Sequence, residues 1–179
     1  MEMSDLYFIV GYDIEQFEEY YRSLDHLHNF YRARGLRDSQ MNELGDDERR
    51  HIESNPDHLI IWMDQDQIVG HSIWHETSTD EMTAGDPRDE DDRETLRKLF
   101  GGKRENLVEL HEVWLRTKHR GKRYGHHFFS FFEDFVRERD FDGIVYYTDD
   151  VAAIALCRRR EYREAFLERE GWYVFSKSV

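Results

Sequence analysis

The sequence has few of the residues that cross-link a chain or place it in a membrane: one cysteine, Cys157, and no long hydrophobic run in 179 residues. A single cysteine excludes an internal disulfide and a multi-cysteine zinc site, which favours a reducing compartment. No apolar run approaches the roughly 18 to 20 residues that a bilayer crossing needs, and the first residues lack the basic and then apolar order of a signal peptide. We therefore expect a cytoplasmic protein without a membrane partner.

Hydrophobic residues nevertheless make up 39% of the sequence and aromatic residues 15%, which is enough to bury one sizeable core. The sequence shows no internal repeat and no low-complexity segment. We therefore expect one folded domain over residues 1–179.

Charge is spread unevenly along the sequence. The 25 lysines and arginines against 39 aspartates and glutamates give a net charge of −14, which disfavours binding to nucleic acid or to an anionic membrane. Nine of the acids lie between Glu76 and Glu94, whereas residues 116–123 carry five lysines and arginines and no acid. A cationic loop in so acidic a protein predicts a local site for an anion, and an ordinary basic surface loop is the alternative.

Hydrophobic periodicity and turn residues predict the elements of the first half of the chain. In order, they are a strand over 6–10, a helix capped by Asp13, a helix capped by Asp25 and ended by Gly35, a solvated helix within 38–53, and a hairpin of strands over 58–63 and 67–76. The acidic stretch that follows, up to Asp92, is predicted to be a long mobile loop near the entrance for a substrate.

The second half alternates helices and strands. The predicted elements are a helix over 93–100 ended by Gly101, a strand over 107–115, a helix from Tyr124 to near Asp140, a strand over 143–148, a helix capped by Asp149 or Asp150, and an antiparallel pair over 162–167 and 172–175. The long helix repeats apolar residues at three and four positions, which is the buried stripe of an amphipathic helix; these are Phe128, Phe131, Phe132, Phe135 and Val136.

The basic loop lies between a strand and a helix, an arrangement suited to bind phosphate. Such a loop points backbone N–H groups and the positive end of the helix dipole at one spot. Gly121 and Gly125 let the backbone approach a ligand closely, and four side chains can offset its charge, namely those of Lys118, Arg120, Lys122 and Arg123. The loop lacks the ending of a P-loop and the glycine spacing of a dinucleotide fold.

Residues 113–125 resemble the acyl-CoA loop of the GNAT superfamily of N-acyltransferases, whose pattern is Leu-x-Val-x-Pro followed by Arg/Gln-x-x-Gly-x-Gly/Ala. The residues that match in register are Arg120, Gly121, Lys122, Tyr124 and Gly125. Arg123 stands where the family has its middle glycine, and Thr117 stands where it has proline.

A second stretch resembles the family pattern Asn-x-x-Ala-x-x-Leu-Tyr-x-x-x-Gly-Phe, which lies on the helix after the fifth strand. The same spacing here gives Asp150, Ala153, Leu156, Cys157, Glu161 and Tyr162. Two motifs in the expected order, separated by a helix and a strand, support each other more strongly than either would alone.

The resemblance implies an α+β fold with a mixed, twisted sheet of about seven strands flanked by helices, whose fourth and fifth strands splay apart around the pantetheine of acetyl-CoA. It also implies that the pyrophosphate lies on the loop from Arg120 to Gly125 and that the main chain of Val113 and Leu115 pairs with pantetheine. The residues expected to bind this cosubstrate are Val113, Leu115, Arg120, Gly121, Lys122, Arg123, Tyr124, Gly125 and Asp150.

The implied reaction is direct transfer of an acetyl or other acyl group from CoA to a primary amine. The site must remove a proton from the amine, stabilise the oxyanion and protonate the departing thiolate. Glu112 is the favoured base, with His111 and Glu109 behind it. The family's usual acid, a tyrosine, is replaced by Cys157, and Tyr162, Tyr147, Tyr146 or water could supply the proton instead.

A metal is not expected, because the histidines occur only in pairs that lack a third and fourth ligand. The pairs are His71 with His75, His126 with His127, and His26 with His28. The acidic surroundings favour a cationic amine, either a small molecule or a peptide. A non-catalytic acyl-CoA-binding or regulatory module is the alternative function, and a homodimer is left open.

Overall fold

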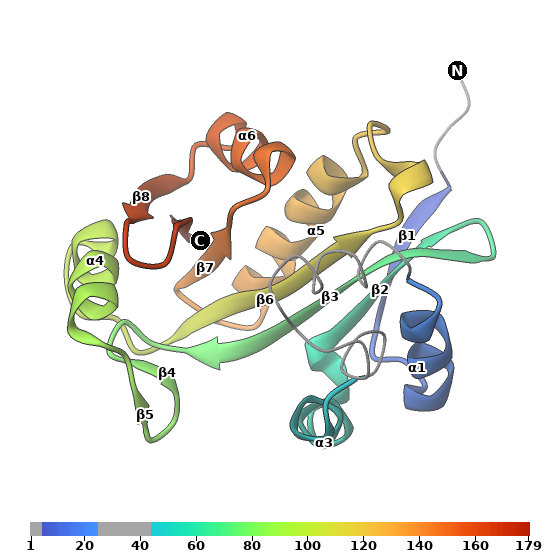
Figure 1. Cartoon of the computed structure of the whole chain (residues 1–179), viewed down its shortest axis with the longest axis horizontal. Helices are drawn as coiled ribbons and strands as arrows, with labels where there is room; N and C mark the ends of the chain where they lie inside the picture. The colour runs from blue at the N-terminus through green and yellow to red at the C-terminus, as the bar shows by residue number, and fades with distance from the viewer. Residues whose placement is uncertain (1–4, 25–43) are drawn as a thin grey trace. The chain divides into compact units, whose positions relative to one another are not determined.

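The computed structural model describes residues 5–24 and 44–179, and Figure 1 labels its elements. The strands are β1 (Leu6–Val10), β2 (Leu59–Asp64), β3 (Gln67–Thr77), β4 (Glu81–Thr83), β5 (Asp86–Pro87), β6 (Leu107–Leu115), β7 (Gly143–Thr148), β8 (Arg163–Leu167) and β9 (Trp172–Ser178). The helices are α1 (Ile14–Arg22), α3 (Asp46–Ser54), α4 (Glu90–Phe100), α5 (Tyr124–Glu138) and α6 (Val151–Arg159), with single 3-10 turns η2 (Pro56–His58) and η3 (Thr117–His119).

Most predicted elements agree with these within a few residues. The helix predicted to begin at Asp25, the pair His26 and His28, and the first part of the segment 38–53 lie outside the described residues. The rest of that segment forms α3. None of the helices in residues 5–24 and 44–179 combines the length and the apolar character that a membrane crossing requires.

One seven-stranded sheet has the strand order β1-β2-β3-β6-β7-β9-β8. β6 and β7 run parallel, whereas the pairs β1–β2, β2–β3, β7–β9 and β8–β9 are antiparallel. The prediction of a mixed sheet of about seven strands in an α+β fold is therefore confirmed. The ladder between β6 and β7 joins Leu107–Leu110 to Gly143–Tyr146, so the part of β6 that carries Glu112 lies beyond it.

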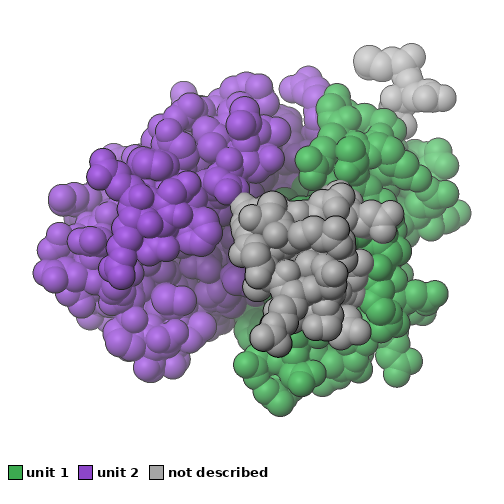
Figure 2. Space-filling view, in the orientation of Figure 1, with its two compact units in different colours: residues 1–73, 112–122 green, residues 74–111, 123–179 purple. Residues whose placement is uncertain are grey.

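The chain separates into two compact units, which Figure 2 shows in different colours. Unit 1 comprises residues 1–73 and 112–122, and unit 2 comprises residues 74–111 and 123–179. β3 and β6 each contribute residues to both units. The expectation of a single domain stays a prediction, and each unit is described by itself below.

The core of unit 1 lies where α1 packs on the β1–β2–β3 hairpins. Asp13 caps the helix as predicted, because its Oδ1 accepts a hydrogen bond from the Gln16 N–H at 2.9 Å. The buried face of α1 carries Phe17, Tyr20 and Tyr21, which join a cluster of apolar strand residues. Burying these rings contributes several kcal/mol in all, at about 1.5 to 3 kcal/mol for each large apolar side chain.

The core of unit 2 combines the phenylalanine stripe of α5 with a cluster under α4. Phe128, Phe132, Phe135 and Val136 are buried as predicted, but Phe131 is only half-buried, and Phe129 is buried in addition. The cluster at α4 consists of buried apolar residues, namely Leu96, Phe100, Leu107, Val145 and Val174.

The prediction of a long loop over the acidic stretch is wrong. This stretch forms the β4–β5 hairpin, and α4 begins at Glu90, three residues before the predicted start. Polar side chains order it: Ser78 Oγ accepts hydrogen bonds from the backbone N–H groups of Asp80 (3.2 Å) and Glu81 (2.9 Å). Asp89 caps α4 by accepting from the Asp92 N–H at 3.0 Å.

Candidate active site

Glu112 lies in the second half of β6 with its carboxylate held by two side chains of unit 1. The Oε2 atom is 2.8 Å from Nε2 of His71 on β3, and Oε1 accepts a hydrogen bond from the Tyr21 hydroxyl of α1 at 3.3 Å. The Glu112 side chain is 13% exposed, whereas that of His71 is fully buried. A carboxylate with some access to solvent and firm hydrogen-bond donors has the position that a general base needs.

His71 in turn contacts Tyr20 of α1. Its Nδ1 is 3.0 Å from the Tyr20 hydroxyl, and the Arg116 guanidinium lies 5.0 Å from the centre of the Tyr20 ring. Burial raises the pKa of Tyr20 far above its ordinary value; the Arg116 charge lowers it and the Glu112 charge raises it, but burial dominates. The phenol is therefore protonated at neutral pH.

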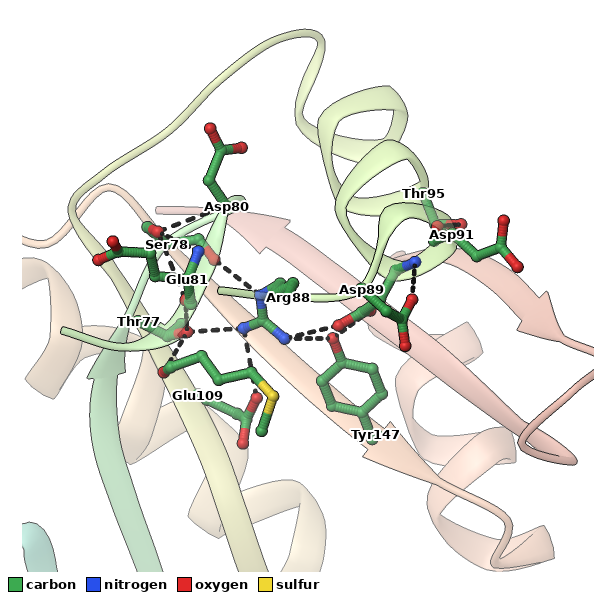
Figure 3. A network of polar contacts seen from close by, with 12 residues as sticks. Thr77, Ser78, Asp80, Glu81, Arg88, Asp89, Asp91, Thr95, Glu109 and Tyr147 are labelled. Carbon is green, nitrogen blue, oxygen red and sulfur yellow. Dashed lines mark hydrogen bonds and ion pairs between the residues drawn. The ribbon is translucent and has the colours of Figure 1, made fainter. Parts of the chain in front are cut away.

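The predicted alternative base, Glu109, belongs to a different network in unit 2, which Figure 3 shows. Its Oε2 is 2.9 Å from Nε2 of His75, and its Oε1 is 3.5 Å from the Arg88 guanidinium. Burial alone would raise the pKa of Glu109. The hydrogen bonds from His111 and His75 and the charge of Arg88 outweigh that effect and hold the pKa well below its ordinary value.

Arg88 is the centre of that network. Its side chain is 2% exposed and donates hydrogen bonds to the Ser78 carbonyl at 2.9 Å, to Asp92 at 2.8 Å and to the Tyr147 hydroxyl at 2.9 Å. The Tyr147 hydroxyl donates to Asp92 at 2.7 Å, and burial raises its pKa far above the ordinary value. Arg88 thereby fixes the acidic hairpin to β6 and β7, as Figure 3 shows.

His75, Glu109 and His111 are the one group among the described residues whose side chains could hold a metal ion. Their ligand atoms lie within 4.8 Å of one another. The Arg88 guanidinium beside Glu109 opposes a further cation there. We assign no metal to this group, and the expectation of a metal-free enzyme stays a prediction.

The basic loop begins in unit 1 with η3 and Gly121. Gly121 has φ +80°, a left-handed conformation that glycine adopts without strain, and a Cβ added there would meet no atom of the described residues within 4 Å. Lys122 is exposed, and Arg120 folds back so that its Nε donates to the Leu115 carbonyl at 3.3 Å. Val113 and Leu115 are half-buried.

The unit 2 part of the loop opens α5. Arg123 occupies the N-cap position with φ +65° and makes no side-chain capping bond, and Tyr124 is the first helical residue. The Arg123 side chain therefore does not compete with an anion for the first backbone N–H groups of α5. An added Cβ at Gly125 would lie 3.1 Å from a Leu156 methyl carbon, so glycine there also permits close packing of α6.

The residues predicted on and after α6 are mostly structural in their contacts. Asp150 caps the helix by accepting from the Ala153 N–H at 2.9 Å. Cys157 is fully buried, and burial, with the Glu133 charge, raises the pKa of its thiol to about 12. Burial likewise raises the pKa of Tyr162 well above its ordinary value, and Lys177 Nζ lies 5.2 Å from the centre of its ring.

Comparison with known proteins decides the identity. The sequence profile described as the acetyltransferase (GNAT) family matches residues 18–162, which is most of the chain. The chain belongs to the GNAT acetyltransferase family. It is therefore an acetyl-CoA-dependent N-acetyltransferase. No match is found among curated protein sequences.

Solved structures agree with the fold of this GNAT protein. A mosquito arylalkylamine N-acetyltransferase-like protein is 12% identical with a TM-score of 0.64, over 97% of this chain and 100% of that one. The Drosophila melanogaster polyamine N-acetyltransferase is 12% identical with a TM-score of 0.64, over 98% and 100%. The PaiA N-acetyltransferase of Thermoplasma acidophilum, solved with coenzyme A, is 12% identical with a TM-score of 0.64, over 99% and 100%.

Two residues with a left-handed backbone conformation occupy positions where the two GNAT motifs have glycine. Arg123 has φ +65°, and Glu161, which precedes Tyr162, has φ +63°. A left-handed conformation costs a residue with a Cβ roughly 1 to 2 kcal/mol. The backbone thus keeps the conformation that favours glycine at both positions, although glycine itself is absent.

Sequence reasoning missed three residues of the site, namely His71, Tyr20 and Tyr21. His71 was noticed only as a potential metal ligand paired with His75. The available signal was its place in β3 between Val69 and Ile73, two buried apolar residues on the same strand face. A histidine at an inward position of a strand needs polar partners, which here are Glu112 and Tyr20.

Proposed function

We propose that this acetyltransferase transfers the acetyl group of acetyl-CoA directly to a primary amine, with Glu112 as the base that accepts the amine proton. The observation that carries the proposal is the pairing of the Glu112 carboxylate with His71 and Tyr21 on a partly exposed strand segment. These contacts fix both carboxylate oxygens, and the 13% exposure of the Glu112 side chain lets an amine proton reach them directly or through water.

The chemical steps balance without a further reactant. Glu112 takes a proton from the ammonium group, directly or through one water molecule, and the nitrogen lone pair attacks the thioester carbon. The nitrogen of the tetrahedral intermediate still carries one proton too many. As the C–S bond breaks, the nitrogen gives up this second proton, which leaves the neutral amide, and the departing CoA thiolate takes up one proton to give the thiol. Glu112 later returns its proton to solvent.

The candidates for the group that protonates the CoA thiolate are water and the two predicted residues, Cys157 and Tyr162. Both side chains are buried and both have raised pKa values, so each holds its proton firmly. A donor that holds its proton more firmly than the thiolate does gives a weak driving force for transfer. These contacts favour water as the donor and core packing as the role of Cys157.

We propose the loop from Arg120 to Gly125 as the site for the pyrophosphate of acetyl-CoA, with the main chain of Val113 and Leu115 beside pantetheine. The left-handed Gly121, the uncapped start of α5 and the exposed cations of the loop support this assignment. To pair with a ligand, the Leu115 carbonyl would exchange its bond with Arg120. Asp150 serves as the cap of α6, so any role in cosubstrate binding is through placing that helix.

A cationic amine is the substrate class that we propose. The net charge of −14 attracts a protonated amine over long range. Solved relatives include enzymes named for polyamines, agmatine and arylalkylamines. Their low identity leaves open which of these amines, or a peptide, fits this site.

The test is release of CoA thiol from acetyl-CoA over a panel that contains agmatine, a polyamine, an arylalkylamine and a peptide with a free N-terminus. We expect turnover of at least one amine by the wild-type protein and a loss of about a hundredfold or more in Glu112→Gln. Glu164→Gln is the matched control, because Glu164 is a surface partner of Arg158 in unit 2. CoA binding without thiol release from any amine of the panel would contradict the proposed transfer to a cationic amine.

The loop assignment has its own measurement. Calorimetry should show CoA binding that weakens with salt, and Gly121→Val should weaken it strongly, because a β-branched residue resists the left-handed conformation. Unchanged CoA affinity in Gly121→Val would contradict the assignment.

A further inference from the structure

We propose that His71 is a positioning residue for the base, which together with Tyr20 orients the Glu112 carboxylate and keeps it ionised; this inference rests on the proposed function. His71 does not touch the reacting atoms. Its role is to present a single N–H donor to Oε2 of Glu112 from a fixed direction.

In the arrangement that we propose, the hydrogen bonds run in one direction from Tyr20 to Glu112. The Tyr20 O–H donates to Nδ1 of His71, which lies 3.0 Å from the hydroxyl oxygen. Nδ1 then acts as an acceptor, so the ring proton resides on Nε2. Nε2 donates to Oε2 of Glu112 at 2.8 Å. The buried phenol thereby selects the tautomer that supports the ionised carboxylate.

The ring of His71 is enclosed by three aromatic side chains of α1. The ring centres of Phe17, Tyr20 and Tyr21 lie 5.3, 5.5 and 5.6 Å from that of His71, and no part of His71 is exposed. This enclosure restricts the imidazole and shields the His71 end of the bond to Glu112 from water. A hydrogen bond to a charged group is stronger in such surroundings than in water.

The surroundings also argue against a purely packing role. Position 71 lies between the buried apolar residues Val69 and Ile73, where an aliphatic side chain would pack without polar cost. An imidazole at this place stabilises the fold only while both ring nitrogens are bonded. The ionisable and charged groups facing it are Tyr20 and Tyr21 from α1, Glu112 from β6, and Arg116, which stacks on Tyr20.

Two substitutions of similar shape separate a donor role from packing. Glutamine can place its amide N–H near the former position of Nε2, whereas the shorter asparagine reaches only the former position of Nδ1. His71→Gln should therefore keep the donor to Glu112, and His71→Asn should lose it. We expect kcat to fall about tenfold or more in His71→Asn and only a few-fold in His71→Gln.

The pH dependence of kcat/KM separates the two roles, because a change in packing alone would not shift its acid limb. Without the Nε2 donor the Glu112 carboxylate protonates more readily, so the acid limb of the kcat/KM profile should move to higher pH in His71→Asn. The limb should stay in place in His71→Gln. CoA affinity and the thermal midpoint should be similar in the two variants.

Equal losses in the two variants with unmoved acid limbs would overturn the proposal. If neither His71 variant folds, Tyr20→Phe tests the proposal instead. This variant keeps the ring but removes the hydroxyl that selects the His71 tautomer, so the acid limb of its kcat/KM profile should also move to higher pH. A pH profile of Tyr20→Phe identical to that of the wild type would then overturn the proposal. The proposed function fails separately, through normal turnover in Glu112→Gln.

Discussion

Two carboxylate–histidine pairs involve the same two strands, β3 and β6, yet their surroundings differ. Glu112 pairs with His71, whose second ring nitrogen meets the Tyr20 hydroxyl inside the core of unit 1. Glu109 pairs with His75, whose second ring nitrogen meets the Glu76 carbonyl at 3.0 Å, and which is partly exposed. In unit 2 the carboxylate also faces Arg88.

The difference lies in what stabilises each negative charge. Burial would raise the pKa of Glu109, but hydrogen bonds from His111 and His75, with the charge of Arg88, depress that pKa and make protonation costly. Glu112 contacts His71 and the Tyr21 hydroxyl inside unit 1. We therefore expect Glu109 to serve a structural network and Glu112 to be the base that accepts the amine proton and returns it.

The largest expected effect comes from removing the cation beside Glu109. Arg88→Met takes the guanidinium from the largely buried carboxylates of Asp92 and Glu109 and removes the anchor of the acidic hairpin. Breaking a buried ion pair in this way costs about 3 to 5 kcal/mol of unfolding free energy. Urea unfolding followed by circular dichroism measures this loss.

Arg97→Met is the matched control. Arg97 pairs with Asp80 on the surface, and its side chain is 45% exposed, so its removal should cost no more than about 1 kcal/mol. Equal unfolding free energies for the two variants would show that Arg88 does not anchor unit 2.

The sequence predicted the fold well where local patterns repeat. The apolar and polar alternation of residues 107–115, the apolar period of α5 and the capping residues Asp13 and Asp150 are local signals, and the strand, the helix and the two caps that they predict are present in the structure. The prediction for the acidic stretch failed because Arg88 holds that stretch through long-range contacts. The partners of Arg88 come from β6, β7 and α4, and a local sequence pattern does not indicate contacts of this kind.

The site was predictable only in part for the same reason. Glu112 was favoured from its place on the strand, but its partners His71 and Tyr21 are 41 and 91 residues away in the chain. The sequence did not predict the left-handed conformations at Arg123 and Glu161, because a positive φ is expected mainly of glycine. Only the alignment of the two motifs, which have glycine at these positions, indicated them.

A second prediction sharpens the comparison by changing each carboxylate to an amide. Glu109→Gln should lose stability, about 1 to 3 kcal/mol at neutral pH, because Arg88 and His75 lose a charged partner. It should lose much less turnover than Glu112→Gln. A thiol-release assay and urea unfolding on both variants give the two quantities.

The pH dependence of that stability loss has a definite sign. The pKa of Glu109 is lower in the folded chain than its ordinary value of 4.5, so the ionised form stabilises the fold above that pH. This contribution disappears as the pH falls below 4.5 toward the depressed value. The gap in unfolding free energy between wild type and Glu109→Gln should therefore narrow from pH 7 to pH 3. A constant gap would mean that the ion pairs of Glu109 do not stabilise the fold.

The smallest expected effect concerns Tyr21, the second donor to Glu112. Its hydroxyl is 3.3 Å from Oε1, a longer contact than the 2.8 Å between His71 and Oε2. The weaker hydrogen bond, from Tyr21 to Oε1, is the easier one to break when an amine arrives. Oε1 is therefore the oxygen suited to accept the amine proton. Tyr21→Phe keeps the buried ring and its packing, and should lower kcat about two- to fivefold, the equivalent of a hydrogen bond worth about 0.5 to 1 kcal/mol. The thermal midpoint, measured beside kcat, should change little. A loss in Tyr21→Phe larger than that in His71→Asn would reverse the order of the two donors and make Oε2 the oxygen that accepts the proton.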